Sequence, residues 1–212
     1  MTSAERMRNK KLGHSLVQQL QSRNFEAEYC DNATAAKKKV MAMISKEASV
    51  GFGGSITLEQ CGIMDELRNG TYNIVDRDTA KTPEERQELM RKCLTTDIFL
   101  MSANAISEDG QIVNIDGVGN RVAALCYGPK TVIMVIGINK VARTLDDAMA
   151  RARYTAAPVN AQRFPIATPC VQTGVCGNCK RTDSICSQIV ITRLCRPAGR
   201  IKVIIVGESL GL

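Results

Sequence analysis

Four cysteines near the end of the chain have the spacing of a metal centre. Cys170, Cys176, Cys179 and Cys186 form the pattern C-x5-C-x2-C-x6-C. Thiolates this close in sequence can converge on one metal at little cost in loop-closure entropy. Zinc sites more often use two cysteine pairs about 12–20 residues apart, whereas iron–sulfur clusters are commonly held by bunched cysteines with a proline nearby. Pro169 precedes the first cysteine. The pattern therefore favours a [4Fe–4S] cluster, with zinc or no metal as the alternatives.

Basic residues surround this cysteine run. The chain of 212 residues has a net charge of +7, and residues 165–212 hold an excess of basic over acidic side chains. A four-iron cluster on four thiolates carries a net charge of about −2, which such cations would offset. Single-stranded nucleic acid would also need stacking aromatic side chains, and none follows Phe164. We expect counter-ions for an anionic centre and no nucleic-acid partner.

A second group of chemically capable side chains lies between residues 102 and 121. Carboxylates at strand ends can act as acid, base or nucleophile, and amides with an arginine can orient an anionic substrate. Turn chemistry accounts for Asp109-Gly110 and Asp116-Gly117, but not for three asparagines and an arginine together. We predict a small-anion site formed by Asn104, Asn114, Asp116, Asn120 and Arg121, with Glu108 as a candidate catalytic group.

A glycine-rich turn, Gly53-Gly54-Ser55, joins a predicted strand to a predicted helix. Such a turn can present backbone N–H groups to an anion, so these three residues are added to the predicted ligand site. The alternative is a tight turn, since neither the G-x-G-x-x-G pattern nor the lysine of a P-loop is present. His14 is the only histidine and has no context that would support a catalytic triad.

Strands and helices must alternate to position these residues. The predicted strands cover residues 25–29, 48–52, 72–75, 97–102, 112–115, 131–136, 189–193 and 201–206. Helices are predicted over residues 3–23, 33–45, 82–94 and 120–126, from Thr57, and for about a dozen residues after Thr144. Asn32, Thr82 and Thr144 are predicted to cap three of these helices. Unbroken apolar strands favour an α/β fold with one open, mostly parallel sheet covered on both faces. We expect one domain over residues 1–212, with a cysteine-rich metal loop at 165–187.

Composition narrows the class of protein. An apolar content of 44% and a charged content of 23% are typical of a globular domain. No run of apolar residues is long enough to cross a membrane, and the basic N-terminus lacks the apolar core of a secretory signal. Nine cysteines without such a signal indicate reduced thiols, so we expect a cytoplasmic protein. Cys30, Cys61, Cys93 and Cys126 are expected to be buried apolar residues.

Several segments resemble the LUD-domain family of lactate-utilisation proteins. They are GFGGSITLEQCG, NAISEDGQIVNIDGVGNRVAALCYGPKTVIMVIGINK, AAPVNAQR and the cysteine run, and the NxDGxGNR stretch is the most specific. The resemblance extends from about residue 12 to the end. It implies the fold of the NagB/RpiA/CoA-transferase group. It also implies a cytosolic role beside iron–sulfur and redox partner subunits that oxidise L-lactate to pyruvate. Members of the family differ in whether they carry the cysteine run.

Other functions stay open at this point. Glu108-Asp109-Gly110 is similar to the Glu–Asn–Gly turn that carries the catalytic glutamate of CoA transferases, with Asp in place of Asn. The implied fold also hosts sugar-phosphate isomerases. A zinc-binding interaction module is a further alternative, and the chain could form a homo-oligomer. Whether it is an enzyme by itself or a subunit of an oxidoreductase complex is equally open.

Overall fold

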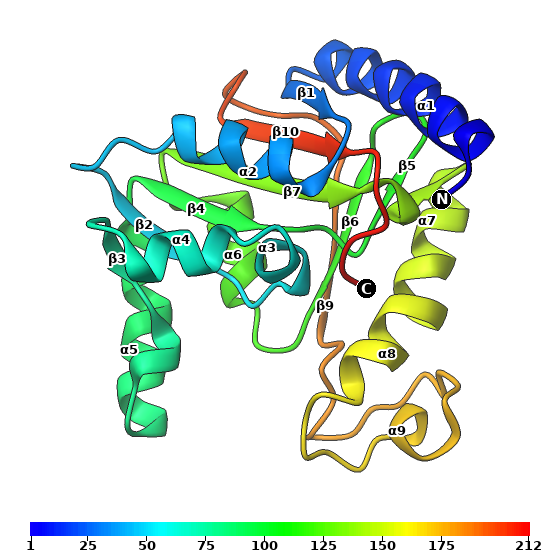
Figure 1. Cartoon of the computed structure of the whole chain (residues 1–212). Coiled ribbons are helices and arrows are strands. Elements are labelled where there is room, and N and C mark those ends of the chain that lie inside the picture. Colours follow the sequence, from blue (N-terminus) through cyan, green and yellow to red (C-terminus); the bar gives the residue numbers. More distant parts are fainter.

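A six-stranded parallel sheet forms the centre of the computed structural model, which describes residues 1–212 (Figure 1). The strand order is β1 (Glu26–Cys30), β10 (Ile201–Val206), β7 (Thr131–Gly137), β4 (Ile98–Met101), β2 (Ser49–Phe52) and β3 (Asn73–Val75). Every neighbouring pair is parallel. The expected α/β fold with a mostly parallel sheet is therefore confirmed.

Helices cover both faces of this sheet, as predicted. One face packs on α1 (Ser3–Ser22), α5 (Pro83–Lys92) and α6 (Asn120–Cys126). The other packs on α2 (Ala33–Ala42), α3 (Ile56–Gln60) and α4 (Ile63–Asn69). Alternate residues of β7 divide between the two cores, with Val132 and Met134 in one and Ile133 and Val135 in the other. Burial on both faces explains why this strand is apolar without alternation.

A second, smaller sheet was not predicted. Its order is β8 (Val141–Ala142), β5 (Ala105–Ser107), β6 (Ile112–Asp116) and β9 (Gln188–Thr192). β5 and β6 form a hairpin whose turn has Gly110 at a φ of +86°, as Asp109-Gly110 predicted. α7 (Leu145–Arg151) packs against this sheet. Because β9 pairs antiparallel with β6, it places the chain beyond the cysteine run next to the polar segment.

Helix starts follow the predicted capping residues with one exception. The side chains of Asn32, Thr82 and Thr144 each accept a hydrogen bond from the backbone N–H three residues later. The start predicted at Thr57 is wrong, because Ser55 caps α3 and its Oγ accepts from the Leu58 N–H at 3.3 Å. The Thr57 hydroxyl instead contacts Lys140.

The helix after Thr144 is longer than predicted and contains a wide turn. α7 continues through a π-helical turn, Ala152–Ala156, into α8 (Ala157–Ala161). Pro158 lacks the N–H that a regular helix would use there, and a π turn accommodates such an interruption.

The cysteine segment lies at one end of the molecule, between α8 and β9 (Figure 1). It contains one short helix, α9 (Pro169–Thr173). Elsewhere, Cys30, Cys61 and Cys93 are buried as expected, whereas Cys126 at the end of α6 is exposed. None of the helices combines the length and the apolar character needed to cross a membrane.

Candidate functional site

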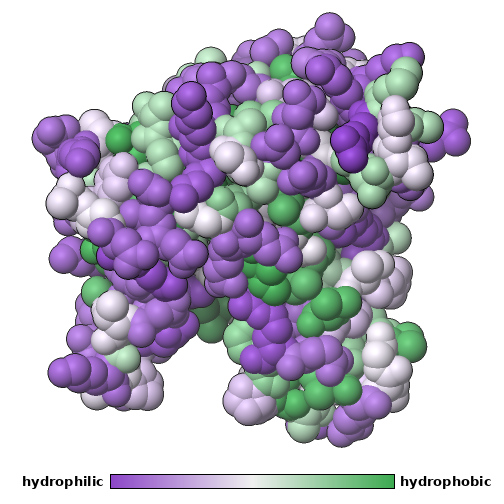
Figure 2. All heavy atoms as spheres, viewed as in Figure 1, coloured by the Kyte–Doolittle hydropathy of each residue, from purple (hydrophilic) through white to green (hydrophobic).

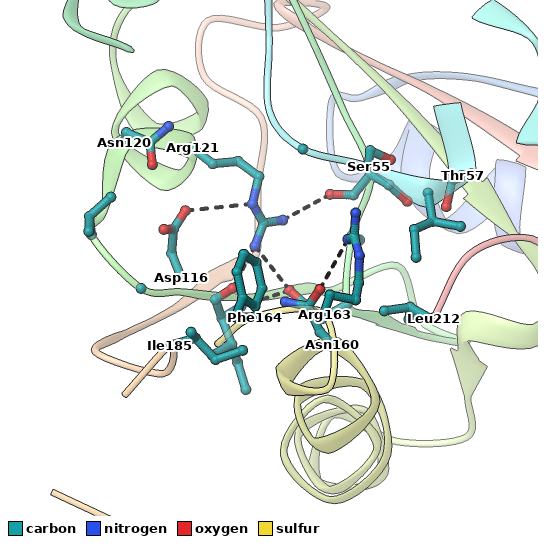
Figure 3. Close-up of a pocket in the computed structure, with 18 of the residues that line it drawn as sticks. Ser55, Thr57, Asp116, Asn120, Arg121, Asn160, Arg163, Phe164, Ile185 and Leu212 are labelled. Atoms are coloured by element: carbon teal, nitrogen blue, oxygen red, sulfur yellow. Dashed lines mark hydrogen bonds and ion pairs between the residues drawn. The ribbon is translucent and has the colours of Figure 1, made fainter. Parts of the chain in front are cut away.

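A cavity of about 460 Å³ opens beyond the carboxyl ends of β2, β4, β6 and β7. Ligands bind at this edge of open parallel sheets. Its lining includes six of the predicted ligand residues: Gly54, Ser55, Asn104, Asp116, Asn120 and Arg121 (Figure 3). The chain thus brings the glycine-rich turn and the polar segment together in one cavity.

Arg121 is fixed by the protein at the centre of this cavity (Figure 3). Its Nη1 donates to the Ser102 carbonyl at 3.2 Å and to Asn114 Oδ1 at 2.9 Å. Its Nη2 donates to Asn104 Oδ1 at 3.2 Å and to a backbone carbonyl of β6. Asp116 lies 3.5 Å from its Nε. Burial lowers the pKa of Arg121 from its ordinary value. With its donors taken up in this way, Arg121 organises the cavity.

Two predicted ligand residues lie directly behind this arginine and do not line the cavity. Asn114 is fully buried on β6 and accepts from Arg121. A Cβ added at Gly53 would lie 2.9 Å from Arg121 Cδ, so the glycine makes room for the arginine stem. Both residues position Arg121.

Arg77 has donors that the protein does not use. It lies in a 3₁₀ turn, Arg77–Thr79, after β3, and a Cβ added at Gly54 would lie 2.6 Å from its Nη2. Its buried Nε has no hydrogen-bond partner. The nearest carboxylate, Asp78, is 4.0 Å away and is held by Arg68 and Arg86, each at 3.1 Å. Burial lowers the pKa of Arg77. Its Nη1 contacts Met90 Sδ at 3.8 Å and its Nη2 makes no hydrogen bond to the protein, so this cation on the cavity wall is only partly satisfied.

Lys140 is a buried amine without a carboxylate partner. It ends the 3₁₀ turn after β7 and is 3% exposed. Its Nζ donates to Thr57 Oγ1 at 2.9 Å, to Ser102 Oγ at 3.0 Å and to the Ala103 carbonyl at 3.1 Å. Burial, with smaller effects of the arginines at positions 151 and 121, lowers the pKa of Lys140 to about 7.

The four cysteines of the predicted metal centre are free thiols on one loop. Burial of the thiol and the neighbouring thiols of Cys176, Cys170 and Cys179 raise the pKa of Cys186 to about 11, although the residue as a whole is exposed. No three Cys, His, Asp or Glu side chains stand in positions that would hold a metal ion. The donor set nevertheless fits a thiolate-bound metal in its chemistry, because thiolates are the usual ligands of zinc and of iron–sulfur clusters. The one carboxylate within the loop, Asp183, is paired with Arg181.

The cysteine loop also forms part of the cavity wall. Ile185, which directly precedes Cys186, lines the cavity together with Phe164 from the start of the loop segment (Figure 3). The Ile185 backbone lies against Gly117, where an added Cβ would be 3.3 Å from its Cα. At the other end, Arg153 Nη2 donates to Asn178 Oδ1 at 2.6 Å and ties the loop to the π turn.

The LUD domain model matches residues 14–206 of this sequence. The chain belongs to the LUD domain family. This family is associated with lactate utilisation, and the membership confirms the resemblance found in the sequence. The fold is similar to that of a DUF162 family protein from Deinococcus radiodurans, with a TM-score of 0.54 and 13% identity over 93% of this chain and 98% of that one. No functionally curated protein matches the sequence.

The charge of the cavity in this LUD domain favours an anion. Five basic side chains line it, and of its three acidic residues Asp78 and Asp116 are already paired with arginines. The basic residues are Arg77, Arg86, Arg121, Lys140 and Arg163. Of these five, only Arg121 was predicted. Lys140 could have been noted because it follows the clearest strand of the chain.

Glu108, the candidate catalytic residue, is not brought to this cavity. It is exposed in the turn between β5 and β6, and its backbone N–H donates to the Ala142 carbonyl at 2.8 Å. The LUD domain thus separates the turn that resembles CoA transferases from its cationic cavity.

Proposed function

We propose that this LUD domain binds a small carboxylate of the lactate and pyruvate type and carries a [4Fe–4S] cluster beside it. In this proposal the protein is a component of a cytosolic system that oxidises L-lactate to pyruvate. One observation carries the proposal: Ile185 belongs to the cavity wall and is the residue before Cys186. A carboxylate site and a thiolate loop that share a wall suit a redox reaction of a small acid.

The cavity supports the carboxylate part of the proposal. Its volume is within the range of about 300–1,000 Å³ that is usual for small-molecule sites. Arg77 lines the cavity, and its Nη2 makes no hydrogen bond to the protein, so it can donate to a carboxylate, while Lys140 adds a buried amine. Phe164 and Ile185 supply apolar surface for a short carbon chain.

The loop supports the metal part of the proposal. Cys170, Cys176, Cys179 and Cys186 would hold the cluster, which when bound carries one electron at a time. Arg153 is close enough to Cys186 to oppose, in small part, the rise of its thiol pKa, and it would offset the negative charge of bound thiolates. Since oxidation of a 2-hydroxy acid releases two electrons, we propose redox partner subunits that accept them.

Anaerobic reconstitution tests the metal. Iron, sulfide and zinc analysis with a visible absorption spectrum should show a four-iron cluster, and Cys176→Ala should abolish the chromophore. Cys195→Ala is the matched control, because Cys195 is fully buried in the core with its Sγ donating to the Pro197 carbonyl at 3.2 Å. It should keep most of the chromophore. Stoichiometric zinc without sulfide would favour the zinc-module alternative and end the redox proposal.

Isothermal titration tests the carboxylate site, with lactate, pyruvate, sugar phosphates and coenzyme A as ligands. Lactate or pyruvate should bind, and Arg77→Ala should weaken binding by about 10- to 100-fold, the value of a charge-assisted hydrogen bond. Arg91→Ala, in an arginine that is 65% exposed on α5, is the control. Preference for coenzyme A, or an acyl adduct at Glu108, would instead support a CoA-transferase-like enzyme.

A further inference from the structure

The polar contacts of Lys140 are all made with uncharged groups. A buried ammonium group is usually paired with a carboxylate because burial of an unpaired charge is costly. Here the Nζ contacts two hydroxyls and one carbonyl, of Thr57, Ser102 and Ala103, and no carboxylate is among the groups that act on its charge. The basic residues at positions 121 and 151 further disfavour the charged amine. This environment favours the neutral form, which has a lone pair.

The amine also lies where a ligand can reach it. Lys140, Thr57 and Ser102 all line the cavity, and Arg77 lines the same cavity. If Arg77 binds the carboxylate of a ligand on one wall, the carbon bonded to that carboxylate can face Lys140 on another wall. In a 2-oxo acid that next carbon is a carbonyl, the electrophile with which lysine amines react.

We propose that Lys140 forms an imine with 2-oxo acids bound in the cavity. The proposal rests on the proposed function of the cavity as a carboxylate site and adds a covalent step to it. The Nζ lone pair attacks the carbonyl carbon and forms a C–N bond, while the carbonyl π electrons move to the oxygen, which takes up the proton that the nitrogen gives up. The resulting carbinolamine loses its hydroxyl together with the remaining N–H proton as water, and the nitrogen lone pair forms C=N. One water molecule is released, and neither an oxidant nor a reductant is consumed.

The two hydroxyls beside the amine suit the proton transfers of this step. Thr57 Oγ1 and Ser102 Oγ lie 2.9 and 3.0 Å from Nζ, and each can both donate and accept a proton. The lowered pKa of Lys140, about 7, agrees with a useful fraction of neutral amine near neutral pH.

Reductive trapping tests the proposal on the full chain. Pyruvate is added with sodium borohydride, which converts an imine into a stable secondary amine, and the intact mass and the modified peptide are determined. We expect one adduct per chain, on Lys140. Lactate, which has no carbonyl, should give none. Lys140→Arg should abolish the adduct, whereas Lys130→Arg, at a side chain that is 84% exposed, should leave it unchanged.

The possible failures are distinguishable by titration of the same samples with pyruvate. If pyruvate binds but no adduct forms on Lys140, the imine is refuted and the proposed function stands. If adducts form only on surface lysines, to the same extent in Lys140→Arg, the imine is likewise refuted. If pyruvate does not bind at all, the proposed function falls with it. Peptide mapping of the unsubstituted chain gives this answer even where a variant fails to fold.

Discussion

Arg121 and Arg77 lie in one cavity and have different tasks because their surroundings differ. The guanidinium of Arg121 is used up by carbonyl and amide oxygens of β4, β6 and their connections. That of Arg77 has a buried Nε without a partner. A satisfied arginine stabilises the architecture, whereas an unsatisfied one gains most from a ligand.

Arg121→Lys should lower the free energy of unfolding by about 1–3 kcal/mol, because lysine cannot replace several hydrogen bonds in a fixed planar arrangement. Urea denaturation measures the change. The control is Arg91→Lys, an exposed residue paired with exposed Glu88, which should change stability by less than about 0.5 kcal/mol. Equal effects of the two substitutions would contradict the role of Arg121 as an organising residue.

Lys140 should make stability depend on pH just above neutrality. Its pKa is lowered from 10.5 to about 7, with Arg151, Arg121 and Cys61 as the charged or titratable groups that act on it. Above pH 7 the unfolded chain therefore binds the proton more strongly than the folded chain, and stability rises with pH. From pH 7 to 8.5 the unsubstituted chain should gain relative to Lys140→Met, by up to about 1.4 kcal/mol per pH unit. Urea denaturation measures the free energy of unfolding of both proteins across this pH range. An equal pH dependence of the two would refute the prediction.

Which residues of the cavity could be predicted from the sequence depended on how they are grouped along the chain. Asn104, Asp116 and Arg121 were found because amides, acids and an arginine cluster within one segment. Arg77 and Lys140 are isolated in the sequence, and only burial without a counter-ion makes them distinctive. Glu108 had the right chemistry but is exposed in a hairpin turn and does not line the cavity.

At the scale of elements, the turn between β2 and α3 has two glycines with different neighbours. A Cβ at Gly53 would meet the stem of Arg121, which four hydrogen bonds hold in place. A Cβ at Gly54 would meet only the tip of Arg77, which can move. A substitution at Gly53 should therefore affect mainly stability, and a substitution at Gly54 should affect mainly ligand binding.

Gly53→Ala should cost about 1–3 kcal/mol of stability through overpacking, whereas Gly54→Ala should cost less than about 1 kcal/mol. Gly54→Ala should nevertheless weaken carboxylate binding, because it displaces the Arg77 guanidinium. Urea denaturation and calorimetric titration of both variants provide the comparison. A large loss of stability in Gly54→Ala, with Gly53→Ala unaffected, would reverse our assignment of the two arginines.

Elements were predictable where local chemistry decides them. Caps at Asn32, Thr82 and Thr144 and the apolar run of β7 are local signals, and all four were confirmed. The second sheet was missed because β5 and β8 have only three and two residues, too few for a pattern, and β9 pairs with β6 from a distant part of the chain.

At the scale of the whole molecule, the cysteine segment extends from a framework of two sheets. Figure 2 shows apolar side chains on the surface in the lower right part of the view, where Figure 1 places α8 and α9. Val159, Phe164 and Val175 are among the exposed apolar residues of this region. The sequence predicted the loop itself. Its position against the cavity could not be predicted, because that position results from the pairing of β9 with β6.

Trypsin should cleave the metal-free chain first at Lys180 or Arg181, which are both exposed in this loop. The two fragments should stay together, because β9 and β10 are held in separate sheets on the far side of the cut. Loading with metal should slow this cleavage several-fold, and Cys176→Ala should remove the protection. Gel electrophoresis over time, with native mass spectrometry of the products, measures both effects. Equal cleavage rates with and without metal would show that the thiols do not order the loop.

The shared wall at Ile185 has a thermodynamic consequence. Because Ile185 would border both the proposed carboxylate site and the proposed metal site, binding at one site would change the affinity of the other. The coupling free energy is the same in both directions. If pyruvate binds more tightly to the metal-loaded chain by some factor, the metal must bind more tightly to the pyruvate-bound chain by that factor. In the proposed function, the bound acid would then strengthen binding of the cluster, and the chain without the cluster would bind the acid more weakly. Through Ile185 and the adjacent Cys186, the fraction of chains that hold the proposed cluster would thus depend on the concentration of the acid.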